Sequence, residues 1–483
     1  MDIIIPAIDV TAILPQLMLV CVATLVLILG LFNGMRKVIP YLSLAFLAGT
    51  GVVVITLWGQ GTRAFSDLSA MMVLDDFTVF STLIFISGGI LTILISIAYA
   101  ENRGIDRSEY YALILYAIAG MSMMSASVNL FTFFLSLEVL SISLYVLIGI
   151  EYQESASNES ALKYFLLGAF ASGFILYGIA LIYGGSGSTD YSMITSTISQ
   201  GPNALLFAGL GLLLVGIGFK ISMAPFHTWT PDVYQGAPTP ISAFMSTGSK
   251  AAGFAVLVRI FASVFPELRV DWAPLLSGLA VLTIAIGNLV ALAQTDLKRL
   301  LAYSSIAHAG YMLLAIVAGG QDGSASILFY LLIYTLMNMA AFGVIAVLSA
   351  RGETCNSLDD IAGLGRRSPV PALVMAVAMF SLAGIPPTAG FVAKFYVFTA
   401  LIKADYISLA IIGVLFSGVS LYYYLRVVVW MYMKESARPV ETLGNLSYGG
   451  IAALCLSALA MLQMGIAPSY LLRIAQQAVS MLQ

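Results

Sequence analysis

Apolar runs of about 20 residues recur along almost the whole of this 483-residue chain, and they limit its fold more than any other feature. Only 9% of the residues are charged, whereas an average soluble domain carries about 25%. Such a chain cannot cover a soluble surface, and helices satisfy their own backbone groups in lipid. The sequence therefore predicts an all-α polytopic membrane protein that lies in the lipid bilayer.

About fourteen runs are long enough to span a bilayer, with ends placed to within about 2 to 4 residues. They cover residues 11–32, 38–58, 78–100, 110–127, 130–150, 161–184, 203–223, 240–263, 274–294, 299–319, 324–350, 370–403, 406–433 and 449–468. The polar connections near 184–203 and 351–369 have too few apolar residues to form a soluble domain. After the last span, apolar residues recur at helical spacing from Leu471 to Leu482, which predicts either a short interfacial helix or a frayed end.

The basic residues divide unequally between the two sides of the membrane if these spans alternate. One side collects Arg36, Lys37, Arg103, Arg107, Lys298, Arg299, Arg351, Arg366, Arg367, Lys434 and Arg438, and the other mainly Arg63, Arg269, Lys403 and Arg473. By the positive-inside rule, the first side faces the cytoplasm and both termini lie on the outer, periplasmic face. One miscounted span between 130 and 350 would invert half of the chain. The acidic residues Glu151, Glu154 and Glu159 on the inner side carry little weight in this rule.

Charge and cysteine usage exclude several classes of function. The net charge of -3 offers no basic face for nucleic acid, so nucleic-acid binding is not expected. The three cysteines have no CxxC spacing, and the two histidines have no metal-ligand pattern around them. No metal site and no redox cofactor are therefore expected in this chain.

Four ionisable residues lie within spans, away from the ends where long side chains reach water: Glu138, Lys220, Lys250 and Lys394. A charge at the centre of a membrane helix costs about 2.5 to 3.5 kcal/mol, which packing alone does not explain. An unpaired lysine in a low dielectric gives up its charge readily, as a proton relay requires, whereas arginine does not. The residues therefore predict a proton relay. Static Glu–Lys pairing that only fixes helix packing is the alternative.

Five further residues are open to more than one interpretation. Lys163 is either a snorkelling anchor or a relay member, and His308 lies in a polar cluster that favours a relay role. His227, near a helix break, is expected to make a structural hydrogen bond. Arg259 is expected at the membrane interface. Arg426, which is always charged, is expected to pack against its tyrosines or to act as a counter-ion.

Proline-rich segments interrupt two of the predicted helices next to lysines. APFHTWTPDVYQGAPTP follows Lys220, and GIPPTAG precedes Lys394. Broken helices in two similar halves are typical of transporters, because freed backbone groups need protein or a water-filled cavity around them. The half-helix dipoles are expected to favour a cation at Lys220, near a C-terminal end, and to disfavour one at Lys394, near an N-terminal end.

Three of these motifs together resemble a known family. The run KISMAPFHTWTPDVYQGAPTPISAFMSTGSKAAGF, with SLAGIPPTAGFVAKFYVF and LAYSSIAHAGYM, is similar to the N-type antiporter-like subunit of proton-pumping NADH:quinone oxidoreductase, respiratory complex I. The resemblance implies fourteen transmembrane helices. Residues 1–109 would form an N-terminal three-helix segment, 110–263 and 274–433 two inverted five-helix repeats with one broken helix each, and 434–483 the last transmembrane helix and an interfacial tail.

The same resemblance implies roles for the buried charges. Glu138 would modulate Lys220, Lys250 would link the two half-channels and Lys394 would serve the exit, with His308 and Lys163 as further members. In that family the NADH, FMN, iron–sulfur and quinone chemistry belongs to partner subunits, so this chain would hold no cofactor. The expected partners are an M-type antiporter-like subunit and small K-type and J-type subunits in a bacterial inner (plasma) membrane.

Two other functions are compatible with a chain of this kind. A stand-alone cation/proton antiporter of the related multisubunit family would need a carboxylate-rich site for Na⁺, whereas one Glu and three Lys lie here at mid-membrane. A purely structural membrane subunit would need its lysines for assembly but not for turnover. Exchange of Na⁺ for H⁺ by the chain alone would favour the first alternative, and normal proton translocation by an assembled Lys220→Ala variant would favour the second.

Overall fold

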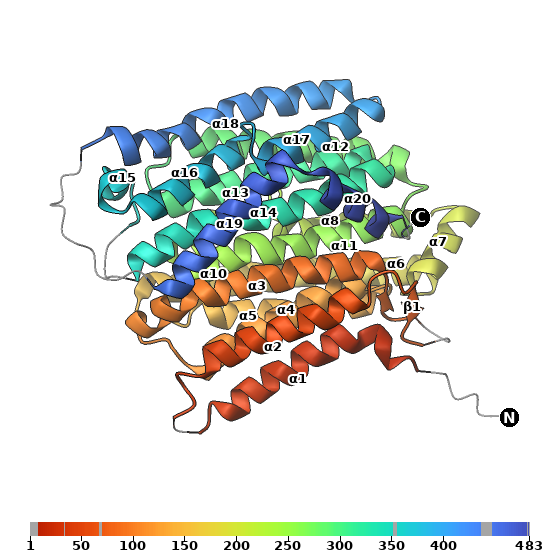
Figure 1. Cartoon of the computed structure of the whole chain (residues 1–483). Helices are drawn as coiled ribbons and strands as arrows, with labels where there is room; N and C mark the ends of the chain where they lie inside the picture. Colours follow the sequence, from red (N-terminus) through yellow and green to blue (C-terminus); the bar gives the residue numbers. More distant parts are fainter. Residues whose placement is uncertain are drawn as a thin grey trace.

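The computed structural model describes residues 8–32, 34–66, 70–350, 355–435, 447–480 and 482. Most of these residues lie on helices that run between the two ends of one bundle (Figure 1). Eleven of the described helices are long and apolar enough to cross a membrane. Two residues counted for the charge asymmetry, Arg351 and Arg438, lie outside the described ranges.

Each predicted span lies on one helix or on two helices in succession. The uninterrupted helices are α1 (Leu14–Leu29, preceded by the 3₁₀ turn η1, Val10–Ile13), α2 (Ile39–Thr56), α3 (Asp76–Arg103), α4 (Ser108–Ala126), α5 (Leu130–Ile148), α6 (Ser155–Ser186), α12 (Arg269–Leu292), α13 (Leu297–Ala318), α14 (Gly320–Ser349), α18 (Ile407–Met433) and α19 (Tyr448–Ile466). The total of fourteen spans stays a prediction, because some of the helices are shorter than a full crossing.

Two helices are interrupted next to a lysine, which confirms the prediction from the prolines. The interrupted pairs are α8 (Ala204–Lys220) with α9 (Trp229–Gly236), and α16 (Pro369–Ala383) with α17 (Ala389–Lys403). After α8 the chain turns through Ser222, whose φ is 63°, and after α16 it turns through Gly384, whose φ is 83°. Both residues adopt the left-handed region, so neither helix can continue past its break.

The helix that carries Lys250 contains a π-helical turn. It starts as α10 (Thr239–Phe244), passes through the turn η2 (Met245–Ser249) and continues as α11 (Lys250–Ser263). A π-turn adds a residue to one helical turn and is frequently found at functional sites. Lys250 is the first residue after this turn.

Short elements mark the two ends of the bundle. The end that carries the two-stranded hairpin of β1 (Arg63–Ala64) and β2 (Val73–Leu74), together with α7 (Tyr191–Gln200) and α20 (Ser469–Val479), is called here the hairpin end (Figure 1). The opposite end carries η3 (Asp359–Ile361) and α15 (Leu364–Arg367) and is called the basic end. The tail after the last span therefore forms a helix and not a frayed end. The hairpin and α7 lie in connections for which no regular structure was predicted.

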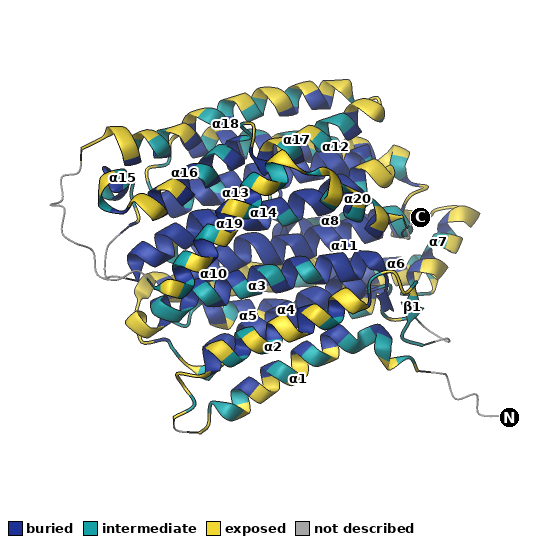
Figure 2. Ribbon diagram, in the orientation of Figure 1, coloured by how far each residue is buried: buried dark blue, intermediate teal, exposed yellow. Residues whose placement is uncertain are grey.

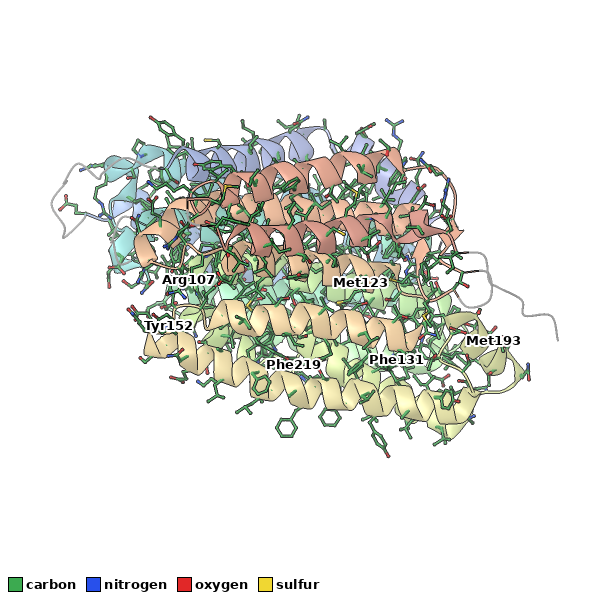
Figure 3. All side chains as sticks on the ribbon, turned by 90° about the horizontal axis from the view of Figure 1, so that it is seen from below. Arg107, Met123, Phe131, Tyr152, Met193 and Phe219 are labelled. Atoms are coloured by element: carbon green, nitrogen blue, oxygen red, sulfur yellow. The ribbon has the colours of Figure 1, made fainter. Side chains whose placement is uncertain are left out.

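Basic residues predicted to share the inner face gather at the basic end. Arg107 lies 5.9 Å from the centre of the Tyr152 ring (Figure 3). Arg103 lies 3.8 Å from the carboxylate of Glu154 in the same region. Arg63, from the opposite set, lies on β1 at the hairpin end, where η1 and α20 also lie. Both ends of the described chain therefore share one face of the bundle, and which side of the membrane this face meets stays a prediction.

Burial increases towards the middle of the bundle (Figure 2). Helices α11, α13 and α14 are buried along almost their whole length. The peripheral helix α6 instead exposes large apolar side chains, among them Phe170 and Tyr177, which are 71% and 61% exposed. An apolar outer surface around a buried centre fits a lipid solvent.

Helices α12 and α13 approach closely through small residues. A Cβ added at Gly287 would overlap the backbone nitrogen of Ala307 and lie 2.8 Å from its Cα, and one added at Gly310 would lie 2.8 Å from the backbone nitrogen of Ile284. Small residues of this kind let membrane helices pack backbone against backbone. The contact fixes the position of α13, which carries His308.

We expect Gly287→Ala to lower the stability of the protein by about 1–3 kcal/mol, because the added methyl group must push α12 and α13 apart. The apparent Tm of the assembled complex would measure the loss. Gly278→Ala on the same helix is the matched control, since a Cβ there meets no atom within 4 Å. A similar loss for both variants would show that helix packing at Gly287 is not the cause.

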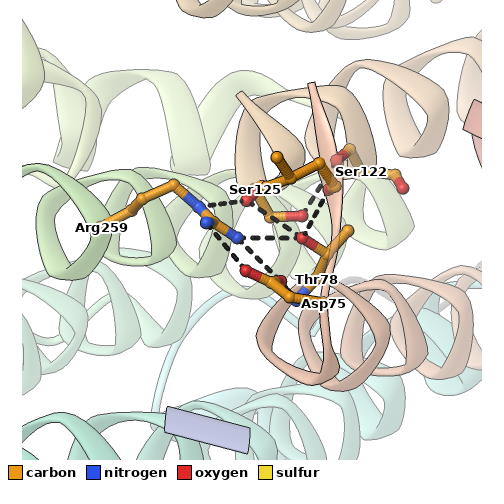
Figure 4. Close-up of polar contacts among 6 residues, drawn as sticks. Asp75, Thr78, Ser122, Ser125 and Arg259 are labelled. Atoms are coloured by element: carbon orange, nitrogen blue, oxygen red, sulfur yellow. Dashed lines mark hydrogen bonds and ion pairs between the residues drawn. The ribbon is translucent and has the colours of Figure 1, made fainter. Parts of the chain in front are cut away.

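A buried ion pair joins three helices at the hairpin end (Figure 4). The two terminal nitrogens of Arg259 on α11 each bond one carboxylate oxygen of Asp75 at 2.9 Å, and both side chains are under 5% exposed. Arg259 Nε donates to the carbonyl of Ser125 on α4 at 2.8 Å, and Nη2 also donates to Thr78 Oγ1 on α3 at 3.0 Å. Arg259 therefore lies near the end of its span, as predicted, but its charge is compensated inside the protein by a carboxylate 184 residues away.

Candidate functional site

Lys220 lies at the break of the first interrupted helix. It is the last residue of α8, and its side chain is buried between α5 and α6. Its Nζ donates to Ser141 Oγ at 2.8 Å and to Tyr164 OH at 3.0 Å, and it lies 5.2 Å from the centre of the Tyr164 ring. The ammonium therefore rests on neutral hydroxyl groups at the C-terminal end of a helix, where the helix dipole favours a cation, as predicted.

Glu138 lies one helical turn before Ser141 on α5 and is partly buried. Its carboxylate accepts a hydrogen bond from the hydroxyl of Ser172 on α6. Among the described residues, no lysine lies within 4.0 Å of this carboxylate, so Glu138 and Lys220 do not form a direct salt bridge. Both side chains lie at the interface between α5 and α6, where Glu138 contacts Ser172 and Lys220 contacts Ser141 and Tyr164.

Lys250 is buried at the start of α11 and reaches across to α13. Its Nζ donates to the backbone carbonyl of Ser305 at 2.6 Å and to the hydroxyl of the same residue. The neighbouring hydroxyl of Ser249 is buried and lies close to Tyr164, which bonds Lys220. Lys250 thus bonds Ser305 and lies next to the hydroxyl of Ser249.

His308 lies one turn after Ser305 on α13 and is enclosed by tyrosines. Its Nδ1 lies 2.6 Å from Tyr330 OH on α14, and its Nε2 lies 3.1 Å from Tyr424 OH on α18. The Tyr424 hydroxyl also bonds the hydroxyl of Ser304. Both ring nitrogens therefore have hydroxyl partners, an arrangement in which a proton can pass from either side of the ring.

Lys394 lies on α17 and binds across the second helix break. Its Nζ donates to the carbonyls of Leu382 and Ala383, which end α16, and to Ser417 Oγ on α18, each at 3.0 Å. It also lies 5.1 Å from the centre of the Tyr311 ring. The predicted unfavourable dipole at Lys394 is wrong, because the side chain folds back onto the C-terminal carbonyls of α16, which favour a cation.

One face of α13 connects the contacts of Lys250 with those of Lys394. Ser305, His308 and Tyr311 follow one another at a spacing of one helical turn, so their side chains share that face. Ser305 contacts Lys250, and the ring of Tyr311 contacts Lys394. The structure therefore brings Lys250, His308 and Lys394 together along one helix, and it places Lys220 with Glu138 in a separate group.

Lys163 lies outside these groups, at the basic end. It is partly exposed on α6 and pairs with Glu159 at 2.7 Å and with Asp232 at 2.9 Å. Asp232 on α9 also pairs with Arg299 at 2.8 Å. Of the two predicted roles, this position favours an anchor in an ion-pair network that holds the segment after the first break.

The two remaining residues, His227 and Arg426, differ in whether they form hydrogen bonds within the described protein. His227 Nδ1 is buried and has no hydrogen-bond partner among the described residues, so the expected structural hydrogen bond is not seen at this atom. Arg426 donates to the carbonyls of Leu292, at 3.0 Å, and of Gln294, and lies 6.0 Å from the centre of the Tyr422 ring. It therefore caps the end of α12, in line with the structural interpretation.

Sequence reasoning missed the neutral residues that bond the lysines. They are Ser141, Tyr164 and Ser417, whereas Ser305 belongs to the polar cluster predicted beside His308. Serine and tyrosine are common in membrane helices, so their type alone carries no signal. The available signal was spacing: Ser141 lies one turn from Glu138, and Ser305 lies one turn from His308. Within the described ranges no three His, Cys, Asp or Glu side chains gather in a possible metal site.

The bundle, its two broken helices and its buried lysines define a membrane protein of the antiporter-like class. Residues 127–420 match the family described as NADH:quinone oxidoreductase/Mrp antiporter, transmembrane. The chain is 47% identical to NADH-quinone oxidoreductase subunit N of Trichlorobacter lovleyi (strain ATCC BAA-1151 / DSM 17278 / SZ), over 98% of each chain. It belongs to the NADH-quinone oxidoreductase subunit N family.

Solved structures show the same fold. A chain of respiratory complex I from Thermus thermophilus with bound aureothin is 36% identical, with a TM-score of 0.80 over 95% of this chain and 98% of that one. A chain of the Mrp complex from Dietzia sp. DQ12-45-1b is 22% identical, with a TM-score of 0.80 over 97% of this chain and 95% of that one. The second likeness concerns the fold alone.

Proposed function

We propose that this chain is a proton-translocating membrane subunit of NADH:quinone oxidoreductase. One observation carries the proposal: the buried ammoniums of Lys220, Lys250 and Lys394 bond hydroxyl and carbonyl oxygens and, in the part of the chain that the structure describes, form no ion pair with a carboxylate. Interior lysines without a carboxylate partner exchange protons more readily than ion-paired ones. Membership of the subunit N family supplies the redox complex that would drive the exchange.

The proposed route uses the groups in chain order. Glu138 sets the electric field at Lys220, so a change of charge in a neighbouring subunit that reaches Glu138 favours or disfavours the proton on Lys220. Lys250 links this group to the α13 face, along which Ser305 and His308 lead to Lys394, the exit group. Lys163 is proposed as an anchor at the basic end of the route.

Buried hydroxyl groups would complete the route through water. Among the described residues, Ser249 Oγ, Tyr311 OH and Tyr334 OH form no hydrogen bond of good geometry with the polar side chains near them, which are Tyr164, Asn288 and Ser305. The three hydroxyls lie beside Lys250, Lys394 and His308 respectively. Buried polar atoms of this kind usually bond ordered water. Water at these three positions would connect side chains that lie too far apart to exchange a proton directly.

The remaining features follow the subunit N family. We propose that NADH, FMN, iron–sulfur and quinone chemistry takes place in partner subunits, and that this chain holds no cofactor. Residues 1–109 are proposed as an N-terminal segment, 110–263 and 274–433 as inverted repeats, and 434–483 as the last span with its tail. The partners are proposed to be M-type, K-type and J-type subunits of a bacterial inner membrane, with both termini on the periplasmic face.

Two lysines of α17 give a matched test. Lys394→Met removes the buried ammonium with little change of volume, and we expect it to slow proton translocation severalfold in the assembled complex. Lys403→Met removes an ammonium from the end of the same helix, where the side chain is 62% exposed and pairs with Asp322 at 2.8 Å. This variant should translocate protons normally, since exposed ion pairs contribute about 0–1 kcal/mol. Dye quenching in vesicles, with quinone reduction measured in parallel, reports both rates.

The same measurement separates the alternatives. Normal proton translocation by Lys394→Met would leave only a structural role for the buried lysine. A pH gradient that depends on Na⁺, in vesicles that contain the chain without a redox substrate, would instead favour a cation/proton antiporter. The described interior does not favour that outcome, because Glu138 lies in the group of Lys220, and no carboxylate of the described residues pairs with Lys220, Lys250 or Lys394.

A further inference from the structure

A pocket of about 360 Å³ opens at the hairpin end of the bundle, far along α11 and α13 from the buried lysines. Its walls come from the ends of α11, α12, α13, α14 and α20. Most of the lining is apolar, with Val258, Phe261, Trp272 and Ile316 on the walls, and Arg269 supplies a positive charge at the start of α12. An apolar pocket with one cation needs an explanation, because the relay does not use it.

The charge of Arg269 is not neutralised by the described protein. Its Nη2 donates to the carbonyls of Val317, at 3.0 Å, and Ala318, which end α13. Among the described residues, Nε and Nη1 donate no hydrogen bond, and no carboxylate lies within 4.0 Å. Gly319 leaves room for the guanidinium, because a Cβ at this position would lie only 3.1–3.3 Å from its Cζ, Nη1 and Nη2 atoms. The N–H groups of Nε and Nη1 therefore remain available to an anion.

The depth of the pocket limits what the anion can be. Arg269 begins a membrane-spanning helix, so its guanidinium lies at the level of the lipid headgroups. The outward face of the same helix is apolar and exposed, with Val270 85% and Leu275 55% exposed. A ligand that enters from this face must combine an anionic group with an apolar chain.

We propose that this pocket binds one membrane phospholipid. A phosphate oxygen accepts a charge-assisted hydrogen bond from Nη1 of Arg269, because both N–H groups of Nη2 already donate to the carbonyls of Val317 and Ala318. An acyl chain packs against Phe261, Trp272 and Ile316. The lipid thereby holds together the ends of α11 and α13, the two helices that carry Lys250 and His308. This site is independent of the proposed proton relay.

A density map of the assembled complex in nanodiscs of native lipid tests the proposal directly. We expect two-tailed lipid density with its headgroup at Arg269. A segment of a neighbouring subunit in the pocket, or density for water alone, would overturn the proposal. A phospholipid with a diazirine in its acyl chain supplies a second measurement, and we expect its adducts on peptides that contain Phe261 or Trp272.

Two variants separate this site from general lipid contact. Arg269→Gln should lose the lipid density and reduce labelling of the pocket peptides severalfold. Arg473→Gln removes an exposed arginine from α20 and should leave both signals unchanged. Equal labelling of the two variants would contradict phosphate recognition by Arg269. If Arg269→Gln fails to assemble, the wild-type map and the photoactivated adducts still decide the question.

Discussion

Replacing Lys220 with methionine is expected to reduce proton translocation by the assembled complex at least about tenfold, because a positioned proton-transfer group typically contributes about 10²–10⁴-fold. The lysine supplies the ammonium of the first group, held by Ser141 at 2.8 Å and Tyr164 at 3.0 Å. Methionine fills a similar volume without an exchangeable proton. Vesicles that couple NADH oxidation to dye quenching would measure the loss, with native gels to confirm assembly.

Lys220→Arg distinguishes proton exchange from charge. Arginine keeps the positive charge beside Glu138 but does not release its proton in a protein. We expect this variant to assemble at least as well as Lys220→Met and to translocate protons as poorly. Normal translocation by Lys220→Arg would mean that only the charge matters, and the relay would have to pass elsewhere. Tyr164→Phe, which removes one hydroxyl partner, should produce a smaller loss than either.

Asp75→Asn is expected to destabilise the protein by about 3–5 kcal/mol, because it leaves the buried guanidinium of Arg259 without its counter-charge. The asparagine keeps the N-cap of α3, where Asp75 now accepts the Thr78 N–H at 2.8 Å, so loss of the cap does not contribute. A fall in the apparent Tm of the assembled complex, or in its yield from membranes, would report the effect.

The double variant Asp75→Asn with Arg259→Gln identifies the cause. Removal of both charges leaves no uncompensated ion in the interior, so we expect it to recover more than half of the stability lost by Asp75→Asn alone. The pair holds α3, α4 and α11 together at the hairpin end. Any proton translocation that Asp75→Asn loses through instability should therefore return in the double variant. If the double variant is as unstable as the single one, the hydrogen-bond geometry matters more than charge balance.

The broad architecture could be predicted from the sequence because each relevant signal is local. A bilayer-length apolar run forms a helix wherever it occurs, and proline removes a hydrogen bond within its own helix. The breaks after Lys220 and before Lys394 are therefore visible in the residues around them. The family motifs lie in the same segments, which is why the subunit N resemblance was confirmed by the comparisons.

The contacts of the site could not be predicted, because they join residues far apart in the chain. Lys220 bonds Ser141, 79 residues away, and Arg259 bonds Asp75, 184 residues away. Lys394 shows the same limit at short range: the chain turns between α16 and α17, and the Lys394 side chain reaches back to carbonyls 11 and 12 residues earlier, at the end of α16. Hydropathy and spacing predict the helix on which a residue lies, but they do not predict which neighbouring helix its side chain contacts.

The contacts of Lys394 couple its protonation to the shape of the second break. A protonated lysine has three N–H groups, and three oxygens receive them here: two carbonyls that end α16 and the hydroxyl of Ser417. A neutral amine has only two N–H groups, so one of these oxygens must lose its bond, or Ser417 must turn and donate instead. If the lost bond is one of the two to α16, departure of the proton loosens the junction between α16 and α17 and converts a chemical event into a mechanical one.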